Sequence, residues 1–338
     1  MKKYLIACAA ALLLAAALIY AVNGERAATT AEDGRPKVIT TIFPPYDFAR
    51  AVGGGKTDLS MLLKPGMESH SYSPSPQDII NIQNCDLFIY IGGENDQWVD
   101  RIINSLEKDK RPQVLKLIDC VSPVREELAE GMQEEEGHDG HDHGHDHGHD
   151  HGAAEGEAHE HEGEYDEHIW TSPRNAEKMT AAIMDKLILI DSKNRSFYKE
   201  NAKAYIAELD RLDKDYRRAV ADGRRRSLVF GDRFPFRYLA DEYDLDYAAA
   251  FPGCAAESEA SAATIAYLID KVKKEQIPVV FHIEMSNEKT AEAICNETGA
   301  KKTLLHSCHN LSRSEYEQGA TYISLMRNNL NSLREALR

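Results

Sequence analysis

The sequence SFYKENAKAYIAELDRLDKDYRRAVAD, at residues 196–222, contains no Gly or Pro and repeats its apolar positions three or four residues apart. That spacing is the period of one face of an α-helix. The apolar positions are Tyr198, Ala202, Tyr205, Leu209, Leu212, Tyr216 and Val220. A helix of this length extends for about 40 Å. Because the chain shows an α/β pattern on both sides of it, we predict that one long rigid helix, residues 195–223, joins two domains.

The segment before this helix alternates short β-branched runs with helical runs. We predict strands at residues 38–43, 58–63, 87–91 and 114–118, with helices between them at residues 46–52, 78–83 and 98–106. A further helix is predicted at residues 173–189, because Ser172 and Pro173 provide an N-cap and a first-turn proline. Strands that alternate with helices favour a parallel, doubly wound sheet.

The segment after the long helix repeats this pattern. Strands are predicted at residues 228–230, 247–251, 279–283 and 302–305, and helices at residues 238–243, 260–274, 288–298 and 320–337. The predicted fold class is therefore α/β, with two four-stranded parallel domains at residues 37–194 and 224–338. Ligands of such sheets bind beyond the carboxyl ends of the strands. We accordingly expect a binding site in the cleft between the two domains.

The N-terminus has a positive start, Met1-Lys2-Lys3, followed by an apolar run from Tyr4 to Val22. About 19 apolar residues are long enough for either a signal peptide or a single membrane anchor. We expect residues 1–23 to be one of these and residues 24–36 to be a linker. The body of the chain is then extracytoplasmic, in a bacterial cell envelope.

An insert at residues 130–164 combines imidazole and carboxylate groups in a low-complexity sequence. Residues 138–161 hold nine His in 24 positions, which is far outside ordinary composition. These are His138, His141, His143, His145, His147, His149, His151, His159 and His161. With almost no apolar residue to pack, the insert is expected to be disordered. Imidazole is the commonest protein ligand for borderline divalent metals, so the insert favours zinc gathering over the alternative of a charged linker.

The formal net charge of −16 is concentrated in one region. Residues 126–164 contain fifteen Asp and Glu and no Lys or Arg, which leaves the remainder of the chain near neutral. Because no basic stripe exists to neutralise phosphates, nucleic acid is excluded as an expected partner.

Three further His residues occupy loops where the carboxyl ends of strands place the cleft. His70 lies in a Pro-rich loop, His168 precedes the predicted helix at residues 173–189, and His306 directly follows the strand at residues 302–305. A single loop His is commonly only solvated. Three of them beside a metal-gathering insert favour metal ligands.

Several motifs resemble those of the zinc/manganese-type solute-binding proteins of bacterial ABC importers, the cluster A metal-binding proteins. They are Thr41-Ile42-Phe43-Pro44-Pro45-Tyr46-Asp47-Phe48, Pro65-Gly66-Met67-Glu68-Ser69-His70-Ser71-Tyr72 and Asp166-Glu167-His168-Ile169-Trp170-Thr171-Ser172-Pro173. The resemblance covers roughly residues 37–337. It implies metal held between two domains, and the His-rich insert implies the zinc-specific branch.

The resemblance carries His70 and His168 over as the two ligands of the first domain. In the second domain the family's His or Glu ligand falls on Arg233, which cannot coordinate metal because it stays protonated. Asp232 is the nearest substitute. The family's last ligand, an Asp, falls on His306, and Glu284 matches a supporting acid.

These residues predict a high-affinity zinc-binding protein that delivers Zn²⁺ to an ABC transporter permease and acts as a monomer. A manganese or other divalent-metal protein of the same type is the first alternative, but imidazole ligands suit zinc better than manganese. A zinc enzyme is a weaker alternative, since no HExxH-type motif with a placed general base is present. A surface metal buffer without a transporter is the third alternative.

Two of the six cysteines lie at the carboxyl edge of the second predicted sheet. Cys254 follows the strand at residues 247–251, and Cys308 follows the strand at residues 302–305. We predict a disulfide between them, which would close a loop of about 55 residues and secure the loop that carries His306. Two free thiols and zinc ligation by Cys308 are the alternatives.

Overall fold

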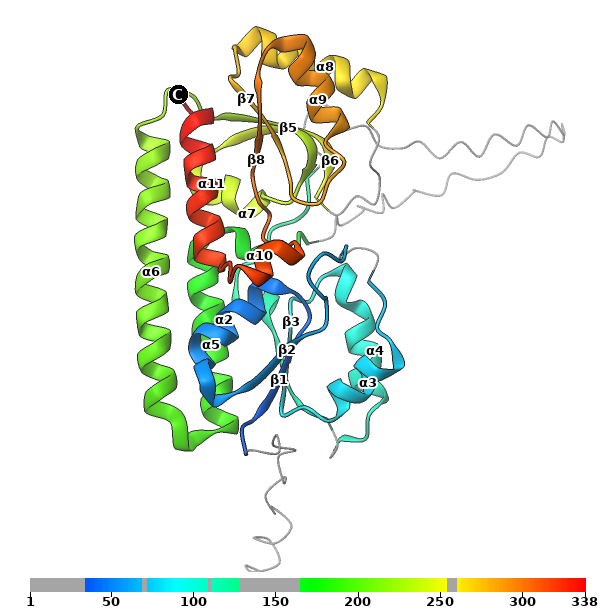
Figure 1. Ribbon diagram of the computed structural model, residues 1–338, viewed down its shortest axis with the longest axis vertical. Helices are drawn as coiled ribbons and strands as arrows, with labels where there is room; N and C mark the ends of the chain where they lie inside the picture. Colours follow the sequence, from blue (N-terminus) through cyan, green and yellow to red (C-terminus); the bar gives the residue numbers. More distant parts are fainter. Residues whose placement is uncertain (1–33, 69–71, 109–110, 128–164, 254–259) are drawn as a thin grey trace, which may run out of the picture.

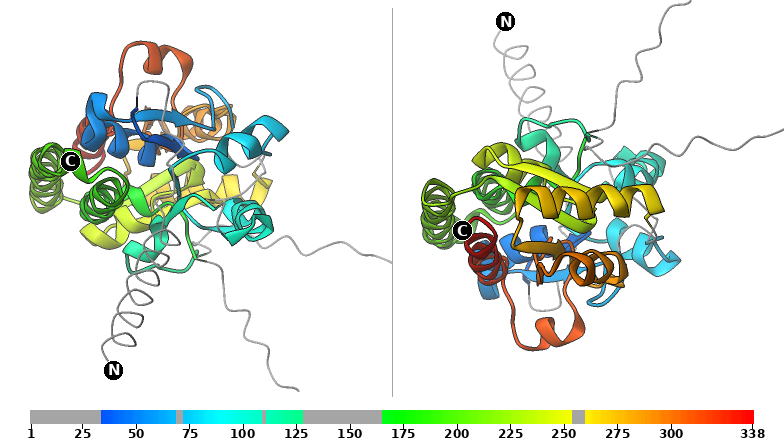
Figure 2. Two further views of the ribbon diagram at one scale, coloured as in Figure 1. Left: turned by 90° about the horizontal axis from the view of Figure 1, so that it is seen from below. Right: turned by 90° about the horizontal axis from the view of Figure 1, so that it is seen from above.

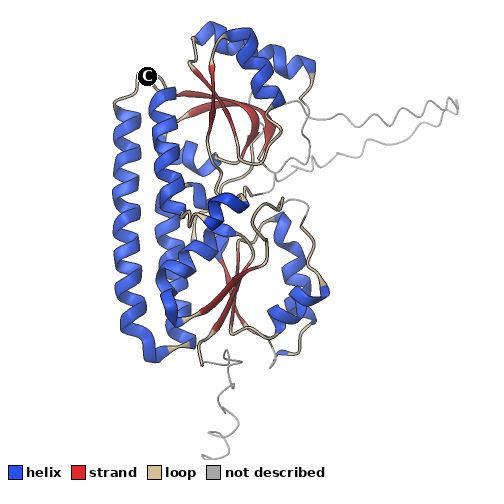
Figure 3. Cartoon of the chain, in the orientation of Figure 1, coloured by secondary structure: helices blue, strands red, loops and turns tan. Residues whose placement is uncertain are grey.

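The computed structural model describes residues 34–68, 72–108, 111–127, 165–253 and 260–338. This part of the chain contains two four-stranded sheets, and every strand pair in them is parallel. Figure 3 shows the two sheets one above the other, each with helices on both sides. The predicted fold class is confirmed, while the exact domain limits stay a prediction.

The first sheet has the strand order β2-β1-β3-β4. Its strands are β1 (Lys37–Thr40), β2 (Asp58–Met61), β3 (Leu87–Tyr90) and β4 (Gln113–Lys116). Its helices are α2 (Phe43–Gly53), α3 (Pro76–Gln83), α4 (Gln97–Ser105) and α5 (Pro173–Ile190). As predicted, Ser172 caps α5 by accepting a hydrogen bond from the Asn175 N–H group.

The second sheet repeats this arrangement with the strand order β6-β5-β7-β8. Its strands are β5 (Ser227–Phe234), β6 (Asp246–Pro252), β7 (Val279–His282) and β8 (Lys301–Leu304). The helices of this half are α7 (Arg237–Tyr243), α8 (Ala262–Glu275), α9 (Lys289–Thr298), α10 (Arg313–Glu317) and α11 (Tyr322–Ala336). The strand order repeats because each half is built from the same kind of crossover unit.

Three elements differ from the sequence prediction. Helix α2 begins at Phe43 and takes Pro44 and Pro45 into its first turn, where a missing N–H group costs nothing. Strand β5 continues to Phe234 through an irregularity between Phe230 and Arg233. Helix α10 was not predicted, because its five residues are too few to show a helical period.

The predicted linking helix is α6 (Arg195–Ala221). It packs against α5 and α2 of the first half and against α11 and α7 of the second half. Figure 1 shows α6 running alongside both halves, and the end-on views in Figure 2 place it next to α11. One continuous apolar core includes residues of both halves, so the two sheets are held in one packed body. In the residues that the structure describes, we find no helix with the length and apolar character needed to span a membrane.

Asp47 connects three helices at the junction of the halves. Its buried carboxylate accepts hydrogen bonds from the Tyr205 hydroxyl of α6 (3.0 Å) and the Tyr322 N–H group of α11 (2.9 Å), and it pairs with Arg50 of α2. The carboxylate therefore ties the linking helix to an element from each half.

We predict that Asp47→Ala lowers the free energy of unfolding by about 3 kcal/mol, since it leaves buried donors without an acceptor. Urea unfolding measures the change. Asp47→Asn retains an acceptor oxygen and should lose less, and Asp210→Ala, which removes an exposed ion pair with Lys214, should leave the midpoint unchanged. An unchanged midpoint for Asp47→Ala would contradict this assignment.

Candidate metal centre

His168 lies on the loop that leads into α5, directly before a short 3₁₀ helix at Ile169–Thr171. The ring is fully buried. Its backbone N–H group donates to the Asp166 carboxylate (2.7 Å), and the Thr171 hydroxyl donates to its carbonyl (2.9 Å). The backbone of His168 is thereby held in one conformation.

The Asp166 carboxylate also determines which ring nitrogen of His168 can bind metal. Nδ1 lies 3.0 Å from an Asp166 oxygen. Since a carboxylate only accepts, Nδ1 carries the proton in the neutral ring, and Nε2 then keeps the lone pair. A carboxylate behind the imidazole is the usual arrangement for a metal-ligating His. Burial opposes the charged form, but Asp166 outweighs it and raises the pKa of His168.

The turn that follows β8 brings the second half of the chain into contact with the loop after β2. The Gly66 N–H group donates to the Leu311 carbonyl (2.7 Å), and the Asn310 amide donates to the carbonyls of Lys64 and Met67. Residues 305–311 are therefore part of the boundary between the halves. They end beside the loop that leads to His70.

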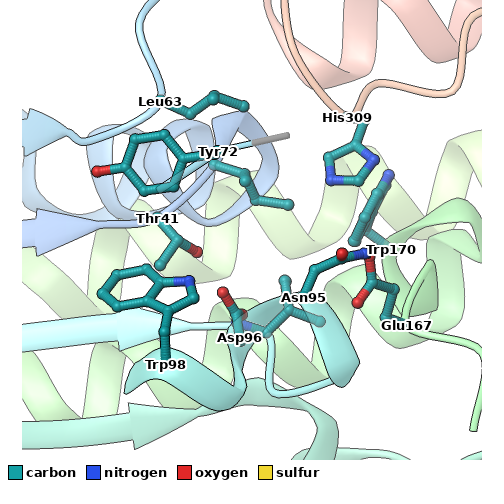
Figure 4. Close-up of a pocket in the computed structure, with 11 residues that line it drawn as sticks. Thr41, Leu63, Tyr72, Asn95, Asp96, Trp98, Glu167, Trp170 and His309 are labelled. Carbon is teal, nitrogen blue, oxygen red and sulfur yellow. The ribbon is translucent and has the colours of Figure 1, made fainter. Parts of the chain in front are cut away.

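His309, which sequence reasoning did not single out, lies next to His168. The two ring centroids are 5.4 Å apart, and the Trp170 ring lies 5.0 Å from His309 and 5.3 Å from His168. Figure 4 shows His309 facing Trp170 at the edge of a small cavity that also contains Glu167 and Asn95. The only signal in the sequence was a second His in the loop after the last strand.

Glu167 completes the polar wall of this cavity. It is buried and accepts a hydrogen bond from the Asn95 amide (2.6 Å). Burial raises the pKa of its carboxyl group, while His168 and Asn95 act in the opposite direction. A carboxyl group thus lines the same cavity as His309 and adjoins His168 in sequence.

His306 does not meet His168 in this structure. Its Nδ1 atom accepts a hydrogen bond from the Cys308 N–H group (2.9 Å), and its Nε2 atom lies 3.4 Å from a Glu315 oxygen. The ring lines a different cavity, together with Asn329 of α11. The ring faces Glu315 in this structure, and the role of His306 as a cleft ligand stays a prediction.

Asp232, the substitute ligand in the sequence prediction, lies between β5 and the end of β7, and its role as a ligand stays a prediction. Its two carboxylate oxygens accept hydrogen bonds from the N–H groups of Arg233 (2.8 Å) and Ile283 (3.1 Å), so it fastens β5 to the end of β7. Arg233, at the position of the family ligand, instead extends to within 3.6 Å of a Glu68 oxygen in the first half.

The remaining predicted ligands cannot be placed. His70 and the nine His of the insert lie outside the described residues. Among the residues that the structure does describe, no group of three or more His, Cys, Asp or Glu is arranged to hold a metal ion. His168 and His309 are the part of the candidate centre that can be seen.

The predicted disulfide is not present. Cys308 is a free, fully buried thiol, and Cys254 lies outside the described residues. Burial raises the pKa of the Cys308 thiol, against the influence of His306. The thiol belongs to the apolar core that also contains Tyr216 and Tyr322, so packing accounts for its position.

Comparisons with known proteins agree with this architecture. Residues 38–336 match the family described as zinc-uptake complex component A, periplasmic. The chain is 31% identical over 303 residues to the zinc-binding lipoprotein AdcA of Streptococcus pneumoniae. The aligned region covers 90% of this chain and 56% of AdcA. The chain is 33% identical over 300 residues to the high-affinity zinc uptake system protein ZnuA of Bacillus subtilis, covering 89% and 87%.

A solved structure shares the fold. The Zn(II)-bound ZnuA-like domain of Streptococcus pneumoniae AdcA superposes with a TM-score of 0.70 at 27% identity, covering 90% of this chain and 99% of that domain. The chain thus spans little more than half the length of the AdcA relatives that it matches, and nearly all of their ZnuA-like domain.

The His306–Glu315 pair yields a prediction for acid stability. The hydrogen bond from His306, ahead of the opposing effect of burial, lowers the pKa of Glu315 from 4.5 to about 2. A carboxyl group with a lowered folded-state pKa stabilises the fold above its unfolded-state pKa and loses that effect as the pH falls to its folded-state pKa. We therefore expect Glu315→Gln to be less stable than the parent above about pH 5, with the difference shrinking between pH 4.5 and about 2.

Urea unfolding as a function of pH measures this difference. Glu317→Gln is the matched control, since it removes an exposed carboxylate from the same helix. A difference that stays constant down to pH 2 would rule out the pairing as its cause.

Proposed function

The chain belongs to the family of periplasmic zinc-uptake components, and on that basis we propose that it captures Zn²⁺ outside the cytoplasm and delivers it to an ABC transporter permease. Membership of this family indicates that the protein takes part in the uptake of a metal ion and does not catalyse a reaction. Zinc is then the cargo of the protein. The permease is the partner that the proposal requires.

One observation carries the proposal. His168 is fully buried at the junction of the two halves, and the Asp166 carboxylate holds its Nδ1 proton so that Nε2 presents a lone pair. A second imidazole, from His309, approaches it from the other half of the chain. An orientated, desolvated pair of imidazoles at a domain boundary suits the capture of a borderline metal ion.

The proposed cargo follows from the type of ligand. Imidazole nitrogens favour zinc, whereas manganese prefers carboxylate oxygens. His70, on the loop after β2, is the further imidazole that the sequence predicts for the same centre. Copper binds such ligands more tightly than zinc does, so selection between these two metals rests on geometry and supply.

The acidic, His-rich insert has an accessory role in this proposal. The thirteen carboxylates and nine imidazoles of residues 130–164 lie in sequence between β4 and the loop of His168. Repeated ligands without a packed framework bind metal weakly, because each binding event must order the chain. The insert would raise the local zinc concentration near the tight site.

The test is a calorimetric titration of the chain with zinc. We expect one tight site plus several weak ones. Deleting residues 134–164 should remove the weak sites and leave the tight site in place. If the tight site disappears with the insert, the insert is the binding site and the proposal fails.

His168→Ala should weaken the tight site at least about 100-fold, since losing a ligand costs more than the 10–100-fold typical of the residue behind a ligand. His282→Ala is the matched control. This partly buried His on β7 lies with its Nδ1 atom 3.7 Å from a Glu288 oxygen, outside the candidate centre. Equal losses for the two variants would show that the effect is not specific to the centre.

A further inference from the structure

The chain segments on either side of the insert lie side by side. Arg125 pairs with Tyr165 in an antiparallel β-bridge, and the Arg125 guanidinium lies 5.1 Å from the centroid of the Tyr165 ring. The Asp166 N–H group donates to the Val124 carbonyl (2.9 Å). We call these residues, 124–125 and 165–166, the stem of the insert. The stem belongs to the first half of the chain and lies directly before His168 in sequence.

The second half of the chain holds the stem through α7, which packs against the 3₁₀ helix that follows His168. The Tyr238 hydroxyl donates to the Asp166 carbonyl (2.7 Å) and accepts a hydrogen bond from the Val124 N–H group (3.2 Å). It therefore bonds both strands of the stem at once. Tyr238 is 4% exposed, so water competes little for either bond. Burial also raises the pKa of Tyr238, which keeps its hydroxyl protonated.

Asp166 connects the stem to the candidate metal centre. Its N–H group is bonded to Val124 and its carbonyl to Tyr238, so both polar groups of its main chain are engaged. Its carboxylate accepts from the His168 N–H group (2.7 Å) and lies 3.0 Å from Nδ1 of the same residue. The carboxylate that orients the imidazole therefore depends on a main chain held by the second half.

We propose that Tyr238 is a positioning residue for zinc binding, which acts on His168 through the stem and Asp166. This inference rests on the proposed function, because it concerns the same zinc site. Tyr238 does not touch the metal in this arrangement. Its hydroxyl keeps the stem closed, and a closed stem keeps the Asp166 carboxylate against the His168 ring.

The length of the connection gives the physical reason for such a contact. Thirty-nine residues separate Arg125 from Tyr165, and their composition predicts little packed structure. Holding the ends of a flexible connection together costs entropy that grows with its length. This cost falls on the stem, two residues before a ligand whose ring must keep one orientation.

The other contact of α7 with this region is weaker. Arg237 pairs with Glu127 (3.0 Å), just beyond the stem, but the Glu127 side chain is 56% exposed and Arg237 also pairs with Asp241 (2.8 Å). Solvent screens an exposed ion pair, so it adds little to stability. Removal of the Tyr238 hydroxyl is therefore the change that should loosen the stem.

The first experiment measures the zinc affinity of Tyr238→Phe with the full chain and a competing chelator. The phenyl ring keeps the packing of α7 and removes only the hydroxyl. We expect the tight site to weaken about tenfold, because zinc then binds only those molecules in which the stem is closed.

Tyr243→Phe is the matched control. Tyr243 lies on the same helix, is equally buried, and donates from its hydroxyl to Asp213 of α6 (3.2 Å). Because this bond does not reach the stem, the zinc affinity should remain within about twofold of the parent.

Deletion of residues 134–164 provides a readout that a general loss of stability would not give. It leaves eight residues between Arg125 and Tyr165 in place of 39, which favours the closed stem about tenfold. In this background Tyr238→Phe should bind zinc within about threefold of the shortened parent. An equal loss of affinity in both backgrounds would overturn the inference, because the hydroxyl would then not act through the stem.

Hydrogen exchange of the zinc-free chain tests the stem without zinc. The bond to the Val124 carbonyl protects the Asp166 N–H group. Tyr238→Phe should speed the exchange of this group at least about tenfold, and Tyr243→Phe should leave it unchanged.

Parent-like zinc affinity in Tyr238→Phe would overturn the inference and leave the proposed function standing. Unchanged exchange of the Asp166 N–H group in that variant would do the same. Absence of any tight zinc site in the parent chain would overturn the proposed function, and this inference with it.

Discussion

Trp170 is the side chain through which the two halves of the molecule and the candidate metal centre depend on one another. It is fully buried, and a buried indole needs an acceptor for its N–H group. That acceptor is the Ser307 carbonyl in the second half (2.7 Å), while the Trp170 carbonyl accepts from the Tyr322 hydroxyl of α11 (2.6 Å). The same ring packs against His168 and His309. One residue thus couples the orientation of the halves to the orientation of both imidazoles.

Several other hydrogen bonds also join the two halves at this boundary. Asn310 and Leu311 are hydrogen-bonded to the loop after β2, and Tyr238 of α7 donates to the Asp166 carbonyl (2.7 Å). A single hydrogen bond contributes about 1 kcal/mol net, so the placement of the loops rests on the set and on the core packed around α6. A site built in advance in this way loses little conformational entropy when it binds its ligand.

The negative charge and the buried nitrogen atoms that could bind metal lie in different parts of the chain. The fifteen carboxylates of residues 126–164 supply an attraction for cations that salt screens over about 10 Å. The centre itself contributes buried, orientated nitrogen atoms, whose effect depends on position much more than on net charge. Gly253, at the end of β6, allows close approach: an added Cβ atom would lie 3.2 Å from Cε1 of His168. In the proposed function, gathering and holding the metal are accordingly separate physical tasks.

Much of the architecture was predictable from sequence, because it follows from local periodicity. The apolar spacing at residues 196–222 predicted α6, and the alternating runs predicted all eight strands within a few residues, apart from the extension of β5. Local chemistry also singled out His168 as a candidate ligand, since it lies between an acidic pair and a helix N-cap in a specific motif. Periodicity could not predict that Pro44 and Pro45 would open a helix instead of ending a strand.

The different surroundings of His306 and His309 were decided only by the tertiary structure. Both residues follow the last strand in one short loop, and nothing local in that loop distinguishes them. Asn329, Glu284 and Trp170, which lie 20 or more positions away in sequence, hold the backbone so that one imidazole turns inward to Glu315 and the other faces His168. Sequence by itself determined which elements form and which loops meet. The direction of each side chain within those loops came from hydrogen bonds that exist only after the two halves have packed together.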